Sequence, residues 1–219
     1  MRKKMRIVVL SPHTDDGEFG AGGTIARFVE EKHEVFYIAF STARKSVKPG
    51  FPKDALKTEV KKATKVLGIP PKNLFIHDYE VRSFPANRQE ILEDLVNYRK
   101  DLAPDIVFLP NSDDMHQDHQ IMHNEGIRAF RITSSLLGYE FPRNNIQFSS
   151  TCFIKLEERH IAKKIAAIKE YKTQADKFYS SEDYLRALAR VRGVQLDHQY
   201  AEAFEAIRII IGKGTTLKP

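Results

Sequence analysis

The sequence predicts a doubly wound α/β fold in which a Rossmann-like, mostly parallel sheet lies between two layers of helices, a three-layer αβα arrangement. Short apolar runs of strand length alternate with segments of helical periodicity through the first 110 residues. Such alternation is typical of parallel sheets joined by right-handed crossovers. Residues 105–110 are also almost continuously apolar, which suits a strand covered by helices on both faces.

The first forty residues have the pattern of a βαβ unit. A β-branched run at residues 5–10 ends at Ser11 and Pro12, a helical pattern opens at residues 22–24, and a second strand follows at 34–40. The elements expected next are a loop at 41–52, a helix that stops at Gly68, a strand at 74–76, a helix at 88–102 and the strand at 105–110. In the last third we expect a buried strand around Cys152, helices at 161–171 and 183–191, and a closing strand at 206–211.

A chain of 219 residues is expected to form a single domain. Residues 1–150 would form the Rossmann-like core and residues 151–219 would complete the same domain, because no repeat, low-complexity segment or linker divides the chain. Cys152 is the lone cysteine and lies in an apolar run. We therefore expect an inert core thiol and a cytoplasmic protein without disulfides.

The charge pattern argues against nucleic acid and membrane partners. Lysine and arginine total 35 against 29 acidic residues, giving a net charge of +6 and a pI of about 9.3. The basic residues are scattered among acids, as on solvated helix faces. The basic residues near the N-terminus are not followed by a signal-peptide core or by an apolar run long enough to span a membrane.

Glycines after the first strand invite comparison with a dinucleotide-binding loop. Gly20, Gly22 and Gly23 do not have the spacing of that fingerprint. Acidic side chains also crowd the turn and would repel a pyrophosphate. The segment therefore does not predict nucleotide binding.

A cation is the better partner for this turn. Four acidic or imidazole side chains lie within six residues: His13, Asp15, Asp16 and Glu18. The carboxyl end of a strand in an open α/β sheet is where ligands bind. His13 and Asp16 could reach one metal ion, which leaves Asp15 as the general base of a metal-assisted hydrolase. The dipole and caps of a helix N-terminus would explain one or two of the acids, but not His13 together with the whole cluster.

A second cluster follows the apolar strand at 105–110, so it can lie on the same rim of the sheet. Three of the eight histidines fall within eight residues here: His116, His119 and His123. His119 and His123 would share a helix face, whereas His116 and His119 could pair instead, so spacing leaves the ligand open. Two histidines, one carboxylate and an open position are typical of catalytic zinc.

These motifs together resemble those of the PIG-L/LmbE family of zinc-dependent N-deacetylases. The resemblance rests on residues 12–18, 22–24 and 116–119, with a further likeness at 192–193 and 200–204. It implies an enzyme that uses Zn²⁺ to remove the acetyl group from an N-acetylated amino sugar of the N-acetylglucosamine type, or from its conjugate. The alternative is a non-catalytic sugar- or nucleotide-binding module with a vestigial metal site, although every expected ligand and the base are present.

The resemblance also implies a role for individual residues. Three positions match the family's zinc ligands: His13, Asp16 and His119. Asp15 matches the general base. A protonated His116 matches the residue that stabilises the oxyanion or protonates the leaving amine, with Asp118 as its orienting partner. This places His123 outside the ligand set.

Substrate-binding residues are harder to predict. Arg82 and Arg44 follow strands and could reach the rim, where they would bind sugar hydroxyls or a phosphate. Glu202 resembles part of a pocket edge. Homo-oligomerisation is an additional expectation, with the charged loop at 41–52 and the C-terminal segment as candidate interfaces.

Overall fold

Seven strands form one sheet in the order β3-β2-β1-β4-β5-β7-β6 in the computed structural model, which describes residues 4–211. The strands are β1 (Arg6–His13), β2 (Glu34–Ser41), β3 (Leu74–Ile76), β4 (Ile106–Pro110), β5 (Ser135–Tyr139), β6 (Cys152–Leu156) and β7 (Tyr200–Arg208). The five strands from β3 to β5 are parallel, whereas β7 pairs antiparallel with both of its neighbours, β5 and β6. The predicted α/β class with a mostly parallel sheet is confirmed.

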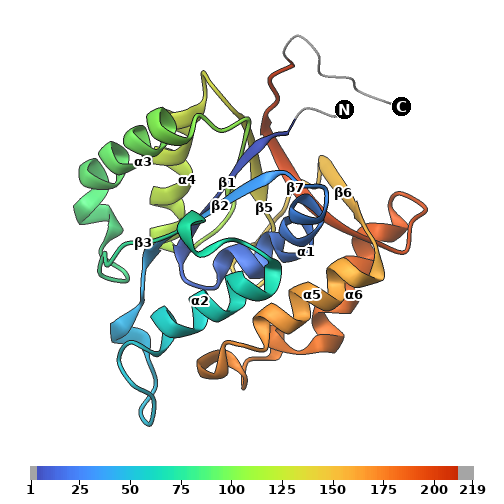
Figure 1. Ribbon diagram of the computed structural model, residues 1–219, viewed down its shortest axis with the longest axis horizontal. Coiled ribbons are helices and arrows are strands. Elements are labelled where there is room, and N and C mark those ends of the chain that lie inside the picture. The colour runs from blue at the N-terminus through green and yellow to red at the C-terminus, as the bar shows by residue number, and fades with distance from the viewer. Residues whose placement is uncertain (1–3, 212–219) are drawn as a thin grey trace.

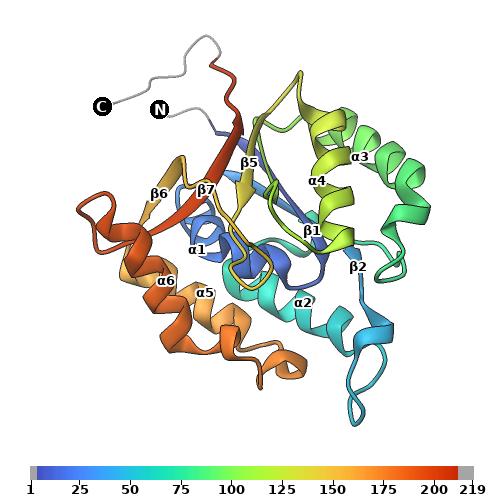
Figure 2. The same cartoon turned by 180° about the vertical axis from the view of Figure 1, so that it is seen from behind.

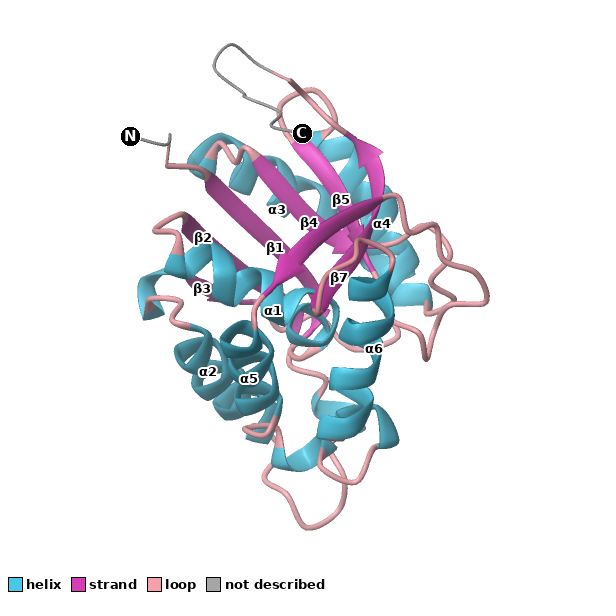
Figure 3. Cartoon of the chain, turned by 90° about the vertical axis from the view of Figure 1, so that its right-hand side faces the viewer, coloured by secondary structure: helices cyan, strands magenta, loops and turns pink. Residues whose placement is uncertain are grey.

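Helices cover both faces of this sheet (Figures 1 and 2). They are α1 (Asp16–Glu30), α2 (Ala55–Leu67), α3 (Arg88–Leu102), α4 (Gln117–Phe130), α5 (Glu158–Ile168) and α6 (Glu182–Val194). The pair α3 and α4 covers one face, while α1 and α2 cover the other and α5 packs against both of them (Figure 3). Within residues 4–211, no helix has the length and apolar character needed to cross a membrane.

The middle of strand β1, residues 7–10, is apolar at every position. Ile7 and Val9 pack into the core beneath α1 and α2, whereas Val8 and Leu10 pack into the core beneath α3 and α4. Successive side chains of a strand point to opposite faces. A strand covered on both sides therefore needs apolar residues throughout.

The connections create a crevice at one edge of the sheet. From β1 the chain moves outward through β2 to β3, and then returns to place β4 and β5 on the other side of β1. The loops that leave β1 and β4 consequently diverge in opposite directions. Such a switch point, at the carboxyl ends of the strands, is where open α/β sheets bind ligands.

Helix α1 begins six residues earlier than the glycine pattern indicated, at Asp16 rather than at Gly22. The glycines are inside the helix because its neighbours approach closely. A Cβ atom on Gly22 would lie 2.8 Å from Cγ of Lys164, and one on Gly23 would lie 2.6 Å from Cδ1 of Leu156. Because Gly22 and Gly23 have no Cβ atoms, α1 can lie directly against α5 and β6.

The C-terminal third extends the same sheet. Strand β7 pairs with both β5 and β6, and α6 packs against β7. The expected closing strand at 206–211 was placed too late, because β7 already begins at Tyr200. Strand β5 was not anticipated, since its run of leucines and a glycine lacks the β-branched residues typical of strands.

Candidate metal and catalytic site

The two motifs predicted from the sequence meet at the switch point between β1 and β4. Strand β1 ends at His13 and α1 begins at Asp16, so both side chains leave one turn. His116 is the N-cap residue of α4, which places His119 in the first turn of that helix. The rings of His13 and His119 approach to 3.3 Å, measured from Nδ1 to Nε2.

Three potential ligand atoms form a nearly equilateral triangle. Nδ1 of His13 lies 3.1 Å from Oδ2 of Asp16, and Nε2 of His119 lies 3.2 Å from the same oxygen. Ligands around a tetrahedral zinc ion with normal bond lengths are about 3.3–3.4 Å apart. The triangle therefore fits an ion of that size. One ring nitrogen of His116 also lies within 4.8 Å of ring nitrogens of the other two histidines.

A carboxylate holds the far side of each ring in the triangle. Oδ2 of Asp118 lies 2.9 Å from Nε2 of His13, and Oδ2 of Asp114 lies 2.7 Å from Nδ1 of His119. Such outer carboxylates fix the orientation of a metal-binding imidazole and make it more basic. Asp114 was not singled out from the sequence, although its position five residues before His119 was the available signal.

The position of Asp118 differs from the expectation that it orients His116. Its carboxylate bonds to His13 and accepts the backbone N–H groups of Arg82 at 2.6 Å and Phe84 at 3.3 Å. Only the backbone amide of Asp118 contacts the ring of His116. The Asp118 side chain is therefore buried against these donors.

Strong electrostatic coupling joins the three ligand atoms. Burial lowers the pKa of His13, but Asp16 and the hydrogen bond to Asp118 outweigh it and raise the pKa to about 9. Burial also lowers the pKa of His119, but Asp16 and Asp114 outweigh burial and raise this pKa to about 10. The pKa of Asp16 is well below its usual value, because His119 and His13 outweigh the effect of burial. The triangle thus favours positive charge at its centre.

Asp15 lies beside the triangle and lines the same cavity. Its pKa is raised to about 7, first by burial and then by repulsion from Asp16. A carboxylate in that range can accept a proton at neutral pH and pass it on. This arrangement suits a general base.

The surroundings of His116 lower its pKa. Burial, followed by the charges on His119 and His13, lowers its pKa to about 4. Its Nδ1 accepts the backbone N–H of Asp118 at 3.2 Å, so the proton of the neutral ring is assigned to Nε2. The lowered pKa favours a neutral ring, and the protonated His116 that the resemblance implies stays a prediction.

Comparison with known proteins assigns the chain to a family. The family profile described as PIG-L, GlcNAc-PI de-N-acetylase, matches residues 8–130. This range is more than half of the chain and contains both motifs. The chain belongs to the PIG-L family.

Individual proteins resemble this PIG-L chain over most of its length. The uncharacterized deacetylase YaiS of Escherichia coli K12 is 24% identical over 177 residues, which are 78% of this chain and 92% of YaiS. The structure of N,N'-diacetylchitobiose deacetylase from Pyrococcus horikoshii matches with a TM-score of 0.78 and 19% identity, over 92% of this chain and 83% of that one. The hydratase GalB from Pseudomonas putida matches with a TM-score of 0.77 and 18% identity, over 99% and 100% of the two chains. These two structural matches establish the fold, which hosts more than one reaction.

The PIG-L site opens into a cavity of about 280 Å³. Its lining includes His13, Asp15, Asp16, His116 and His119 together with residues of four further loops and of α2. Arg44 is outside this lining and pairs with Asp78 at 3.1 Å. Arg82 is also outside it and is exposed, and its contribution is the backbone N–H that binds Asp118. Neither arginine occupies the substrate-binding position expected for it.

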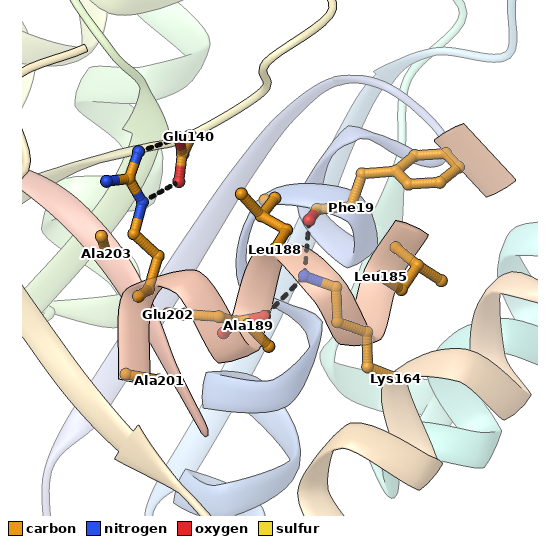
Figure 4. Close-up of a pocket in the computed structure, with 11 residues that line it drawn as sticks. Phe19, Glu140, Lys164, Leu185, Leu188, Ala189, Ala201, Glu202 and Ala203 are labelled. Atoms are coloured by element: carbon orange, nitrogen blue, oxygen red, sulfur yellow. Dashed lines mark hydrogen bonds and ion pairs between the residues drawn. The ribbon is translucent and has the colours of Figure 1, made fainter. Parts of the chain in front are cut away.

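Glu202 lies at the edge of a separate small pocket (Figure 4) and does not line the cavity at the metal site. It is buried and accepts the backbone N–H groups of Gly23 at 3.0 Å and Thr24 at 2.7 Å. Nζ of Lys164 lies 2.6 Å from Glu202 and also donates to the carbonyl oxygen of Phe19 at 2.7 Å (Figure 4). The Lys164–Glu202 pair therefore binds backbone groups in the middle of α1.

Sequence reasoning missed the cations that do line the cavity. They are Lys48, Arg143 and Lys177. Each is on a loop without a recognisable motif, so no local pattern distinguishes it from other surface charges. Only the path of the loops brings them to the PIG-L site.

Proposed function

We propose that the chain is a zinc-dependent N-deacetylase acting on an N-acetylated amino sugar of the N-acetylglucosamine type or on its conjugate. The observation that carries this proposal is the triangle of His13, Asp16 and His119, with Asp15 and His116 on the adjoining cavity wall. Two names among the similar proteins support it, the deacetylase YaiS and the diacetylchitobiose deacetylase.

The metal ion would be held by His13, Asp16 and His119. Asp118 and Asp114 would orient the two imidazoles from behind. A bound zinc ion supplies a Lewis acid for the amide carbonyl and lowers the pKa of water toward ~7.

The protein's own groups would move the protons. Asp15 accepts a proton from the attacking water as the water oxygen bonds to the acetyl carbon. Nε2–H of the neutral His116 donates a hydrogen bond to the oxyanion, and such a donor typically contributes about 3–4 kcal/mol. When the C–N bond breaks, Asp15 returns the proton to the leaving amine, and acetate and the free amino sugar remain.

Acetate release from N-acetylglucosamine and N,N'-diacetylchitobiose tests this proposal. The zinc-loaded chain should release acetate, and a chelator should stop the reaction until zinc is restored. Asp15→Asn should retain the metal but lose at least a hundredfold in kcat, as expected for a missing general base. Full activity of this variant would exclude Asp15 as the base, and zinc binding without acetate release from a broad panel of N-acetyl sugars would favour a binding module.

We also propose a cytoplasmic location, supported by the lone Cys152. The thiol is half-buried in β6. Fractionation of the source cells with an antibody to the protein tests this location.

A further inference from the structure

We propose that the substrate carries an anionic group, a carboxylate or a phosphate, and that Arg143 and Lys177 bind this group. The inference rests on the proposed deacetylase function and specifies the part of the substrate that lies away from the acetamide. The charges on the cavity wall support it. The two carboxylates in the cavity lining, Asp15 and Asp16, belong to the catalytic end.

Three cations converge on the cavity from separate loops. Lys48 follows β2, Arg143 follows β5, and Lys177 lies between α5 and α6. Lys48 and Lys177 are partly buried, whereas Arg143 is exposed. Three like charges around one cavity repel one another, which is unfavourable unless an anion offsets the repulsion. A chance scatter of surface charges would not be expected to bring them together.

Two of these cations form no ion pair with a carboxylate in the described part of the chain, although the charge of Lys177 contributes to the lowered pKa of Asp176. Lys48 forms an ion pair with Asp176. Asp176 is the sequence neighbour of Lys177, so Lys48 already offsets the acid nearest to that lysine. Neither Arg143 nor Lys177 forms an ion pair with a carboxylate within residues 4–211.

Arg143 is held in place while its charge remains available. Its guanidinium carbon lies 5.2 Å from the centre of the Tyr179 ring. Tyr179 itself lines the cavity. Stacking on an aromatic ring orients a guanidinium without neutralising it, and the planar fork can then bind a carboxylate or phosphate through two hydrogen bonds.

The remaining lining can accommodate the uncharged body of such a substrate. Ser46, Asn144 and Gln174 offer polar groups for hydroxyls, and Phe141 offers an apolar face. The cavity thus has a metal-ligand end for the acetamide and a cationic wall for an anion. A neutral N-acetyl sugar would leave the cationic wall without a partner.

The experiment compares probes that share one sugar and differ in charge. Zinc-loaded enzyme is assayed with the methyl glycoside of N-acetylglucosamine, with N-acetylglucosamine 1-phosphate and with N-acetylmuramic acid. The last two separate a phosphate from a carboxylate. At least one anionic probe should have a KM about tenfold or more below that of the methyl glycoside, as expected for a charge-assisted hydrogen bond.

Charge-removing variants identify the residues responsible. Arg143→Gln and Lys177→Gln should each raise KM for the preferred anionic probe about tenfold more than they raise KM for the methyl glycoside. Matched controls are Arg131→Gln and Lys163→Gln, which remove exposed charges outside the cavity lining. Calorimetry with glucose 1-phosphate, which has no amide, measures anion binding independently of catalysis.

The outcomes separate this inference from the proposed function. Hydrolysis of the methyl glycoside with no advantage for either anionic probe overturns the inference and leaves the deacetylase proposal intact. Equal changes for charged and neutral probes in the Arg143 and Lys177 variants also overturn it. Glucose 1-phosphate binding that weakens in those variants, without acetate release from any probe, supports the anion site while the deacetylase proposal fails.

Discussion

The Asp118 carboxylate lies 2.9 Å from Nε2 of His13, while the opposite nitrogen of that ring faces Asp16 at 3.1 Å. A residue of α4 therefore orients a residue of β1, and the two motifs are linked by more than a shared ion. Asp118 is itself held by backbone N–H groups of the loop after β3. Three segments of the chain thus determine the orientation of one imidazole.

Replacing Asp118 with asparagine should weaken zinc binding without unfolding the chain. The asparagine can still accept a hydrogen bond, but it removes the charge that makes His13 basic. Loss of such an outer carboxylate typically lowers metal affinity about 10- to 100-fold. Competition with a chromophoric chelator measures the affinity, and Asp113→Asn, an exposed acid of the loop between β4 and α4, is the control. An unchanged affinity would mean that Asp118 has only a structural role.

Zinc content should distinguish His119 from His123. His119→Ala removes an atom of the ligand triangle, so the purified protein should retain much less than one zinc per chain. In contrast, Nδ1 of His123 lies 2.8 Å from the carbonyl oxygen of Pro110, and the residue is outside the triangle. His123→Ala should therefore retain the metal, as measured by elemental analysis. Loss of zinc in the His123 variant alone would contradict the proposed ligand set.

Truncation of Glu202 should destabilise the protein rather than weaken substrate binding directly. Glu202→Ala leaves Lys164 buried without its partner and frees two backbone N–H groups of α1. Breaking a buried pair in this way costs about 3–5 kcal/mol, which urea denaturation can measure. Glu182→Ala removes an exposed partner of Lys169 and should lower the free energy of unfolding much less, because water screens an exposed ion pair. Similar losses in the two variants would show that burial of the first pair is unimportant.

Arg82→Gly tests whether the backbone or the side chain of Arg82 matters. Arg82 has a φ of 70°, a conformation that glycine adopts more readily than other residues. The glycine keeps the N–H group that binds Asp118, so KM and kcat should be unchanged. The free energy of unfolding should change by no more than about 1 kcal/mol. A raised KM would indicate that the arginine side chain does contribute to substrate binding.

Cys152 should react slowly with alkylating reagents at neutral pH. Burial raises the pKa of its thiol, and the thiolate is the reactive form. The rate of reaction with iodoacetamide should therefore rise with pH along a curve whose midpoint lies above that of an exposed peptide cysteine. Mass spectrometry of the labelled protein follows the reaction. A midpoint below that of the peptide would indicate an activated thiol.

The sequence by itself determined the sheet class and the position of the reactive residues on it. The alternation of strand-like and helical segments is a local property, and it predicted elements such as α3 and β3 with the bounds observed. Polar clusters directly after β1 and β4 must lie at one edge, because parallel strands end together. This predicted that the cluster at residues 13–18 and the histidines at 116–123 lie on the same rim, whereas the choice of His119 among those histidines came from the family resemblance.

Only the tertiary structure decided which side chains face the cavity and which groups each carboxylate bonds to. Asp118 bonds to His13 rather than to the ring of His116, and Glu202 supports α1 rather than a substrate. Arg143 reaches the cavity where Arg44 and Arg82 do not. These pairings depend on the paths of loops and on contacts between distant segments, which have no periodic pattern in the sequence. Burial and charge around each group, which set its protonation, follow from the same long-range packing.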